Sequence, residues 1–259
     1  MQLSLYQVDA FTDRLFAGNP AAVCPLDTWL PDAAMQAIAA ENNLSETAFF
    51  VPRGADYDLR WFTPTVETDL CGHATLASGF VVMTRLTPQR SSVRFHTRSG
   101  PLTVTRQGDM FAIDLPAQPP EPCAMPPNLV AALGRKPAQV LGAVKYLAIY
   151  DSEEEVAALA PDLAAWAHAD RDGVIVSALG RNCDFVSRYF APHAGIPEDP
   201  VTGSAHCTLM PYWAKRLGKT RLHTRQISAR GGELFCELKG DRVVIAGHAA
   251  FYLEGRIHV

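Results

Sequence analysis

The chain has 259 residues, of which 48% are hydrophobic and 19% charged, and a net charge of -4. This composition is typical of a folded globular protein and excludes a disordered or fibrous one, while charges spread along the chain without a basic stripe exclude nucleic acid as an expected partner. The N-terminus lacks the pattern of a signal peptide, and no apolar run approaches the roughly 18 residues of a membrane span. We therefore expect a soluble, cytoplasmic protein with no membrane partner.

The N-terminal part of the chain predicts alternating strands and a helix. Alternation of apolar and polar residues predicts half-buried strands over residues 3–8 and 102–115. Between them a helix is expected over residues 31–43, from the Pro-Asp start signal to the Asn-Asn stop. The apolar run 47–51 then predicts a buried strand, which places Glu46 at its entrance.

A proline-rich stretch over residues 116–127 is interpreted as a linker that can hold neither a helix nor a sheet ladder. It divides the chain into an N-terminal half, residues 1–116, and a C-terminal half, residues 117–259, with the option that the last strand returns to the first half. In the second half, apolar patterns predict strands over 146–150 and 173–178, a helix over 152–159 and a hairpin-like end over 231–253.

An internal repeat connects the two halves. Arg60-Trp-Phe-Thr-Pro64 followed by Cys71-Gly-His-Ala-Thr-Leu76 resembles Arg188-Tyr-Phe-Ala-Pro192 followed by Thr202-Gly-Ser-Ala-His-Cys-Thr-Leu209. The two elements occur in the same order on either side of the linker, with three more residues between them in the second half. This arrangement predicts two related halves and not a solenoid.

Each half contains a glycine at the expected start of an apolar helical segment. Gly72 lies in the segment 71–83, and Gly203 lies in the segment 202–217. Free backbone N–H groups and the helix dipole suit such a place to an anion, above all a carboxylate. If a pseudo-twofold relates the halves, both helix starts face one cleft and could hold one small acidic substrate. The alternative is that the glycines only permit close packing. Neither segment matches a phosphate-binding or dinucleotide-binding loop.

Three titratable side chains are candidates for chemistry. Glu46 is a lone carboxylate entering an apolar run, where desolvation would raise its pKa toward values useful in acid and base catalysis; the alternative is a capping or surface glutamate. His73 could donate a hydrogen bond or relay a proton, or be a buried, satisfied histidine. Asp199 precedes the second helix and could cap it or hold a substrate ammonium group, and Glu198 beside it is expected to be solvated.

A metal centre is not expected. The six cysteines are far apart, without a C-x-x-C pair. His206 and Cys207 could join Cys71 and His73 around an ion, but adjacent His-Cys is not the spacing of a known zinc pattern. No nicotinamide, flavin or pyridoxal signature is visible either, so we expect no cofactor.

Four motifs, in one order along the chain, resemble the signature of the PhzF-like (phenazine biosynthesis isomerase-like) family: Asp9-Ala-Phe-Thr12 with Phe16-Ala-Gly-Asn-Pro20, Ser45-Glu-Thr-Ala-Phe49, Cys71-Gly-His-Ala-Thr75, and Glu198-Asp-Pro-Val-Thr-Gly-Ser-Ala205. The resemblance implies the α/β (α+β) diaminopimelate-epimerase-like fold. Two pseudo-symmetric halves would each wrap a curved mixed sheet around a central helix, with the active site between the halves. It also implies a homodimer.

The same resemblance implies roles for individual residues. The family's prototype isomerises a dihydro-hydroxyanthranilate, with a glutamate matching Glu46 as the proton shuttle and residues matching His73 and Asp199 binding and orienting the substrate. The implied substrate-binding set at the helix starts is Gly72, Ala74, Thr202, Gly203 and Ser204. The expected protein is thus a cofactor-independent isomerase of a small carboxylated, amino-bearing substrate.

Two other functions remain open. Epimerases and racemases of this fold use two opposed cysteines, of which Cys71 matches the first, but Thr202 occupies the second helix start and its hydroxyl is far too weak an acid to replace a thiolate. The other alternative is a catalytically silent protein that binds a small molecule.

Overall fold

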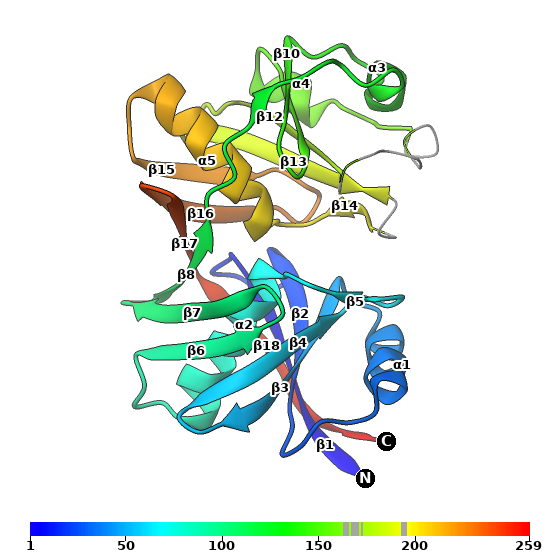
Figure 1. Cartoon of the computed structure of the whole chain (residues 1–259), viewed down its shortest axis with the longest axis vertical. Helices are drawn as coiled ribbons and strands as arrows, with labels where there is room; N and C mark the ends of the chain where they lie inside the picture. Colours follow the sequence, from blue (N-terminus) through cyan, green and yellow to red (C-terminus); the bar gives the residue numbers. More distant parts are fainter. Residues whose placement is uncertain (163–165, 167–170, 172, 193–195) are drawn as a thin grey trace. The chain divides into compact units, whose positions relative to one another are not determined.

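The computed structural model describes residues 1–162, 166, 171, 173–192 and 196–259. The chain forms two compact units, the first comprising Met1–Asp114 with Ala246–Val259 and the second Leu115–Ile245 (Figure 1). The chain passes from one unit to the other within β8 (Met110–Pro116) and again within β17 (Arg242–Gly247). Each unit is described by itself.

The first unit is built on a mixed sheet in which the pairs β2–β3 and β4–β6 are parallel. Besides β8, its strands are β1 (Gln2–Ala10), β2 (Asn19–Pro25), β3 (Glu46–Arg53), β4 (Asp56–Phe62), β5 (Glu67–Thr68), β6 (Ser92–Thr97), β7 (Gly100–Gln107) and β18 (Ala249–His258). β1 and β18 pair antiparallel along their whole length, so the first and last strands of the chain lie side by side. The strands predicted over residues 3–8, 47–51 and 102–115 are confirmed.

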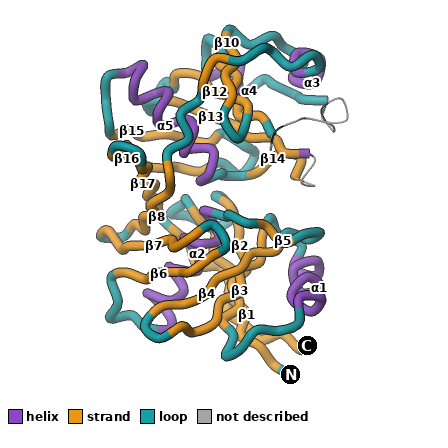
Figure 2. Tube along the Cα trace, in the orientation of Figure 1, coloured by secondary structure: helices purple, strands orange, loops and turns teal. Residues whose placement is uncertain are grey.

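A small-residue helix, α2 (Gly72–Val81), occupies the middle of this unit and continues as one π-helical turn, η1 (Val82–Leu86). It contacts β1, β2, β3, β6 and β7 (Figure 2). All its residues are buried except Phe80. The small side chains allow this close approach, because a Cβ on Gly79 would lie only 2.6 Å from Cγ1 of Val104 on β7.

The outer helix α1 (Asp32–Asn42) packs against β3 and β4. It begins after Pro31, carries an acidic residue in its first turn, and ends at Asn43 in the left-handed conformation, as the sequence signals predict. Met35 and Ile38 bury its inner face in a cluster with residues of β2 and β3. Just beyond this helix the chain enters β3 at Glu46.

The second unit has a second mixed sheet, with the parallel pairs β11–β12 and β13–β15. Besides β17, its elements are β9 (Glu121–Pro122), α3 (Leu129–Leu133), β10 (Gln139–Gly142), β11 (Tyr146–Ile149), α4 (Glu153–Ala157), β12 (Val174–Leu179), β13 (Phe185–Ala191), β14 (Ile196–Asp199), α5 (Gly203–Leu217), β15 (Arg221–Gln226) and β16 (Gly232–Lys239). Trp213 anchors α5 to this sheet: its indole donates to Ser177 Oγ at 2.9 Å and stacks on Phe185.

Strand pairing repeats between the units in order and direction. Three antiparallel pairs correspond: β1–β2 to β10–β11, β3–β4 to β12–β13, and β4–β5 to β13–β14. Two parallel pairs correspond as well: β2–β3 to β11–β12, and β4–β6 to β13–β15. α2 follows β5 as α5 follows β14. The two related halves predicted from the short sequence repeat are therefore confirmed.

Two sequence predictions about loops need correction. The proline-rich stretch does enter a sheet ladder, because Glu121 and Pro122 form β9 and pair with Gly142 and Leu141 of β10; proline is tolerated where it need not donate a ladder hydrogen bond. The C-terminal segment is also not one hairpin: β16 and β17 are joined by a tight turn at Gly240, and β18 pairs instead with β1. Among the described residues, no helix is long and apolar enough to cross a membrane.

Candidate active site

Glu46 is fixed at the first position of β3, as the sequence predicts. Its Cα partner in the neighbouring strand is Ala21, and its side chain is 12% exposed. The next residue, Thr47, accepts a hydrogen bond from Asn42 Nδ2 at 3.1 Å, which ties the end of α1 to the start of β3. The backbone at Glu46 is thus held by a strand and a helix end, and little of the side chain meets solvent.

His73, the second residue of α2, brings three other side chains together. Its Nε2 lies 3.3 Å from Oε2 of Glu46. Its Nδ1 lies 3.2 Å from Nδ2 of Asn19 and 3.5 Å from Sγ of Cys71. Asn19 is fully buried, and Cys71 and His73 are almost so. We call Asn19, Glu46, Cys71 and His73 the Glu46 cluster.

The imidazole of His73 is neutral in this environment. Burial lowers the pKa of His73 to about 3, while a backbone hydrogen bond to Pro20 acts in the opposite direction. A neutral imidazole has one N–H and one lone pair, so without holding a charge it can donate a hydrogen bond to the carboxylate or accept one from the protonated carboxyl. The group of this cluster that is chemically suited to take and return a proton near neutral pH is therefore the carboxyl of Glu46.

Three potential metal ligands also meet here. One ligand atom each from Glu46, Cys71 and His73 lies within 4.8 Å of the other two. The ring nevertheless separates the other two side chains, because Nδ1 faces Cys71 and Nε2 faces Glu46. One ion would have to choose a single nitrogen at about 2.0–2.1 Å. This arrangement suits separate polar contacts on the two sides of the ring better than the binding of one ion.

A second polar cluster surrounds the start of α5 in the second unit. Thr202 is the N-cap residue, and its hydroxyl donates to Asp199 Oδ2 at 2.5 Å. Gln226 accepts from the Thr202 N–H at 2.8 Å and donates to the Asp199 carbonyl at 2.8 Å. All three residues are buried. Asp199 is thus the last residue of β14, with one carboxylate oxygen engaged by Thr202 and its backbone fixed by Gln226.

The remaining sequence-predicted binding residues lie at the two helix starts. Gly72 and Gly203 are the first residues of α2 and α5. Ala74 is buried in the first turn of α2, whereas Ser204 is partly exposed in the first turn of α5. Both glycine segments therefore begin helices, as predicted; binding of a substrate there stays a prediction.

Sequence reasoning missed a matched pair of arginine–glutamate contacts. Arg60 forms two hydrogen bonds of 2.7 Å to Glu67, and Arg188 forms two of 2.7 and 2.9 Å to Glu198. The expectation that Glu198 is solvated is therefore wrong. Each glutamate precedes the first glycine of its helix by five residues, so the repeat contained a signal that could have identified both pairs.

Asn19 and Gln226 were also given no role from the sequence. Asn19 lies 54 residues from His73 in the chain and Gln226 lies 24 residues from Thr202. Only the pairing of β1 with β2 and of β13 with β15 brings them to these places. Asn19 belongs to a motif that the family resemblance contains, but nothing in its spacing indicates a contact with His73.

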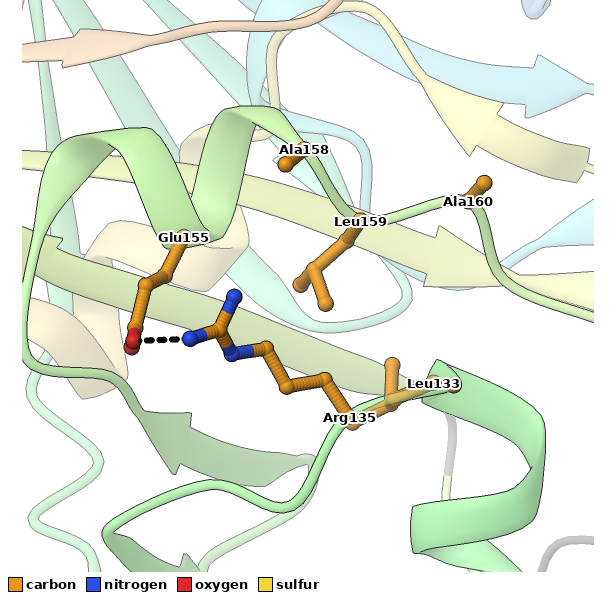
Figure 3. A pocket seen from close by; sticks show the side chains of 7 residues that line it. Leu133, Arg135, Glu155, Ala158, Leu159 and Ala160 are labelled. Carbon is orange, nitrogen blue, oxygen red and sulfur yellow. Dashed lines mark hydrogen bonds and ion pairs between the residues drawn. The ribbon is translucent and has the colours of Figure 1, made fainter.

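A surface pocket of the second unit does not contain these residues. It has a volume of about 400 Å³ and is lined by Leu133, Gly134, Arg135, Glu155, Ala158, Leu159 and Ala160. Figure 3 shows Arg135 and Glu155 turned toward one another as an ion pair. The two ionisable side chains of this pocket are engaged with one another, and its other lining residues are apolar or glycine. The pocket therefore offers no group comparable to the Glu46 cluster for proton transfer.

Two repeated mixed α/β units, each with a helix beginning beside a buried carboxylate, define the diaminopimelate-epimerase-like class, and comparison with solved structures confirms this fold. A hydroxyproline epimerase from Agrobacterium vitis, at 11% identity, aligns over 99% of this chain and 92% of its own with a TM-score of 0.65. A structure from Enterococcus faecalis described as a phenazine biosynthesis protein of the PhzF family aligns over the whole of both chains, with 47% identity and a TM-score of 0.96.

The chain belongs to the family of phenazine biosynthesis-like proteins, whose model matches residues 8–255. A relative from Pseudomonas aeruginosa that is named an uncharacterised isomerase is 57% identical over the full length of both chains. A human phenazine biosynthesis-like domain-containing protein is 39% identical over 99% of each chain. The family resemblance in the four sequence motifs is thus confirmed.

Proposed function

We propose that the protein is an isomerase that moves a proton on a small carboxylated substrate, with Glu46 taking the proton from one atom and returning it to another. The observation that carries the proposal is the 3.3 Å contact between the Glu46 carboxylate and a buried, neutral histidine. Membership of a family whose relatives include named isomerases supports the same reaction class. Neither step of such a transfer needs a redox cofactor.

The helix starts support a carboxylated substrate. Gly72 and Gly203 place free backbone N–H groups and the positive end of a helix dipole at the beginning of α2 and α5. Such groups can stabilise a substrate carboxylate and the negative charge that develops when a neighbouring carbon loses its proton. We propose further that Asp199 binds an amino group of the substrate.

The test is proton exchange in deuterated water. The protein is incubated with dihydro-hydroxyanthranilate and with a panel of amino acids and cyclic acids, and label and isomer are followed by mass spectrometry. The expected result is label or isomer with at least one compound that carries a carboxylate, and its loss when Glu46 is replaced. Tight binding of a panel compound without exchange or isomer would favour a binding protein instead.

Asp199→Asn should weaken the binding of an amine-bearing substrate. Asparagine keeps the size of the side chain and can still accept from Thr202, but it removes the negative charge. Because a hydrogen bond to a charged group contributes about 1.5–3 kcal/mol, KM should rise roughly 10-fold to 100-fold with a smaller effect on kcat. Thr202→Val removes the donor to Asp199 and an acceptor of Gln226 but keeps the negative charge of Asp199, so it separates the loss of charge from a disturbance of this hydrogen-bond network. An unchanged KM in Asp199→Asn would remove Asp199 from the proposal.

Metal removal should leave the exchange rate unchanged. The Glu46 cluster could offer ligands to an ion, but Nδ1 and Nε2 of His73 face different partners. We therefore expect the rate after dialysis against a strong chelator to equal that of untreated protein. A loss of activity that zinc restores would assign these side chains to a metal centre.

Cytoplasmic location and assembly as a homodimer stay predictions from the sequence.

A further inference from the structure

Two hydrogen-bond donors face the same ring nitrogen of His73. The amide nitrogen of Asn19, which can only donate, lies 3.2 Å from Nδ1, and the thiol of Cys71 lies 3.5 Å from the same atom. An acceptor at Nδ1 satisfies both donors, whereas an N–H at Nδ1 would point at both of them and would have to find its acceptor in the backbone oxygen of Pro20, which also bonds to this ring. Asn19 is fully buried, so its amide has no bulk water to bond instead.

A neutral imidazole has one ring proton, and the position of that proton follows from its neighbours. If Nδ1 accepts, the proton is on Nε2, and Nε2 faces Oε2 of Glu46 at 3.3 Å. We propose that Asn19 and Cys71 hold His73 in the Nε2–H tautomer, so that the ring donates toward Glu46 and stabilises its carboxylate form. The inference rests on the proposed function, because the carboxylate is the form of Glu46 that takes the substrate's proton.

This tautomer also affects the second half of a proton transfer. Once Glu46 has taken a proton, its carbonyl oxygen can still accept from the N–H at Nε2, but this hydrogen bond to a neutral group is weaker than one to the carboxylate. His73 cannot accept the proton from Glu46 at Nε2 without first losing its own. The proton on Glu46 is therefore directed back to the substrate, as an isomerase with a single shuttling carboxylate requires.

The experiment measures the tautomer directly. Protein labelled with ¹⁵N at its histidines is examined by long-range ¹H–¹⁵N correlation between pH 5 and 8, and His73→Gln identifies the signals of His73. In the wild-type protein, we expect the proton on Nε2 throughout, since the pKa of about 3 keeps the ring neutral over this range. A proton on Nδ1, donated to the Pro20 carbonyl that also bonds to this ring, would overturn the inference without any variant.

Asn19→Asp replaces the amide donor that faces Nδ1 with an acceptor, while the shape of the side chain stays almost the same. A carboxylate can only accept, so Nδ1 should gain a proton, as the Nδ1–H tautomer or as imidazolium, and Glu46-dependent exchange should fall at least roughly 10-fold. Cys71→Ala keeps the stronger donor and should keep the proton on Nε2. Nδ1 remaining without a proton in Asn19→Asp would overturn the role of Asn19.

The two proposals fail separately. If no compound shows exchange, the proposed function fails, while the wild-type tautomer still decides the inference about Asn19 and Cys71. If exchange depends on Glu46 but the wild-type proton is on Nδ1, the inference alone fails. If Asn19→Asp does not fold, Asn19→Ser is measured in its place, because serine removes the amide and leaves a smaller side chain. Loss of the pure Nε2–H signal in that variant supports the inference, and persistence of the signal contradicts it.

Discussion

Replacement of Glu46 by glutamine is expected to lower the rate of proton exchange by about 10²-fold to 10⁴-fold. Glutamine has the size and the hydrogen-bonding reach of the native side chain, but its amide is neither a base nor an acid near neutral pH. The side chain should still meet Nε2 of His73, which lies 3.3 Å from Oε2 in the native protein. Loss of activity would therefore report the missing proton carrier and not a missing contact.

Two further variants make this result specific. Glu46→Asp keeps the carboxylate but withdraws it by one methylene, and should retain more activity than Glu46→Gln and less than the wild type, since proton transfer depends steeply on distance. Glu41→Gln changes an exposed carboxylate on α1 and should leave the rate unchanged. Wild-type exchange in Glu46→Gln would sink the proposed mechanism, and equal losses in Glu46→Gln and Glu41→Gln would point to a general effect of charge.

Glu46 and His73 could be predicted as candidate site residues because the local sequence marks each of them. Glu46 is a carboxylate that immediately precedes an apolar run, and His73 follows the glycine that begins a small-residue helix. Their partner Asn19 was not predictable in the same way. It reaches His73 only because β2 lies beside β1 and β3 and contacts α2, and such long-range register is not written in the residues around it.

The repeat shows a different limit of sequence reasoning. Short motifs predicted two related halves, and the strand pairing confirms them in detail. The paired arginines and glutamates escaped notice because the second half has three more residues between Arg188 and Glu198 than the first has between Arg60 and Glu67. Glu198 therefore read as a solvated neighbour of Asp199, whereas its ion pair with Arg188 fixes the strand from which Asp199 projects.

Gly18→Ala is expected to lower the free energy of unfolding by about 2–5 kcal/mol and to impair catalysis as well. Gly18 has a φ of +66°, and a Cβ there would lie 2.3 Å from the carbonyl oxygen of Ala10. Neither the backbone carbonyl nor the left-handed conformation can adjust cheaply. Because Asn19 is the next residue, a shift at Gly18 should also displace the amide from Nδ1 of His73.

Gly54→Ala provides a matched control for the backbone term. Gly54 has a φ of +61°, almost the same as Gly18, but a Cβ there would meet nothing within 4 Å. This variant should lose only about 1 kcal/mol and keep its exchange rate. Urea unfolding of both variants, with unchanged m-values, measures the two losses. A greater loss of unfolding free energy in Gly18→Ala than in Gly54→Ala would measure the cost of the contact with Ala10. The exchange rate of Gly18→Ala would then show how strongly activity depends on the position of Asn19. Equal losses in the two variants would mean that the loop before β2 yields to the added methyl group, and that the position of Asn19 is fixed by β2 itself.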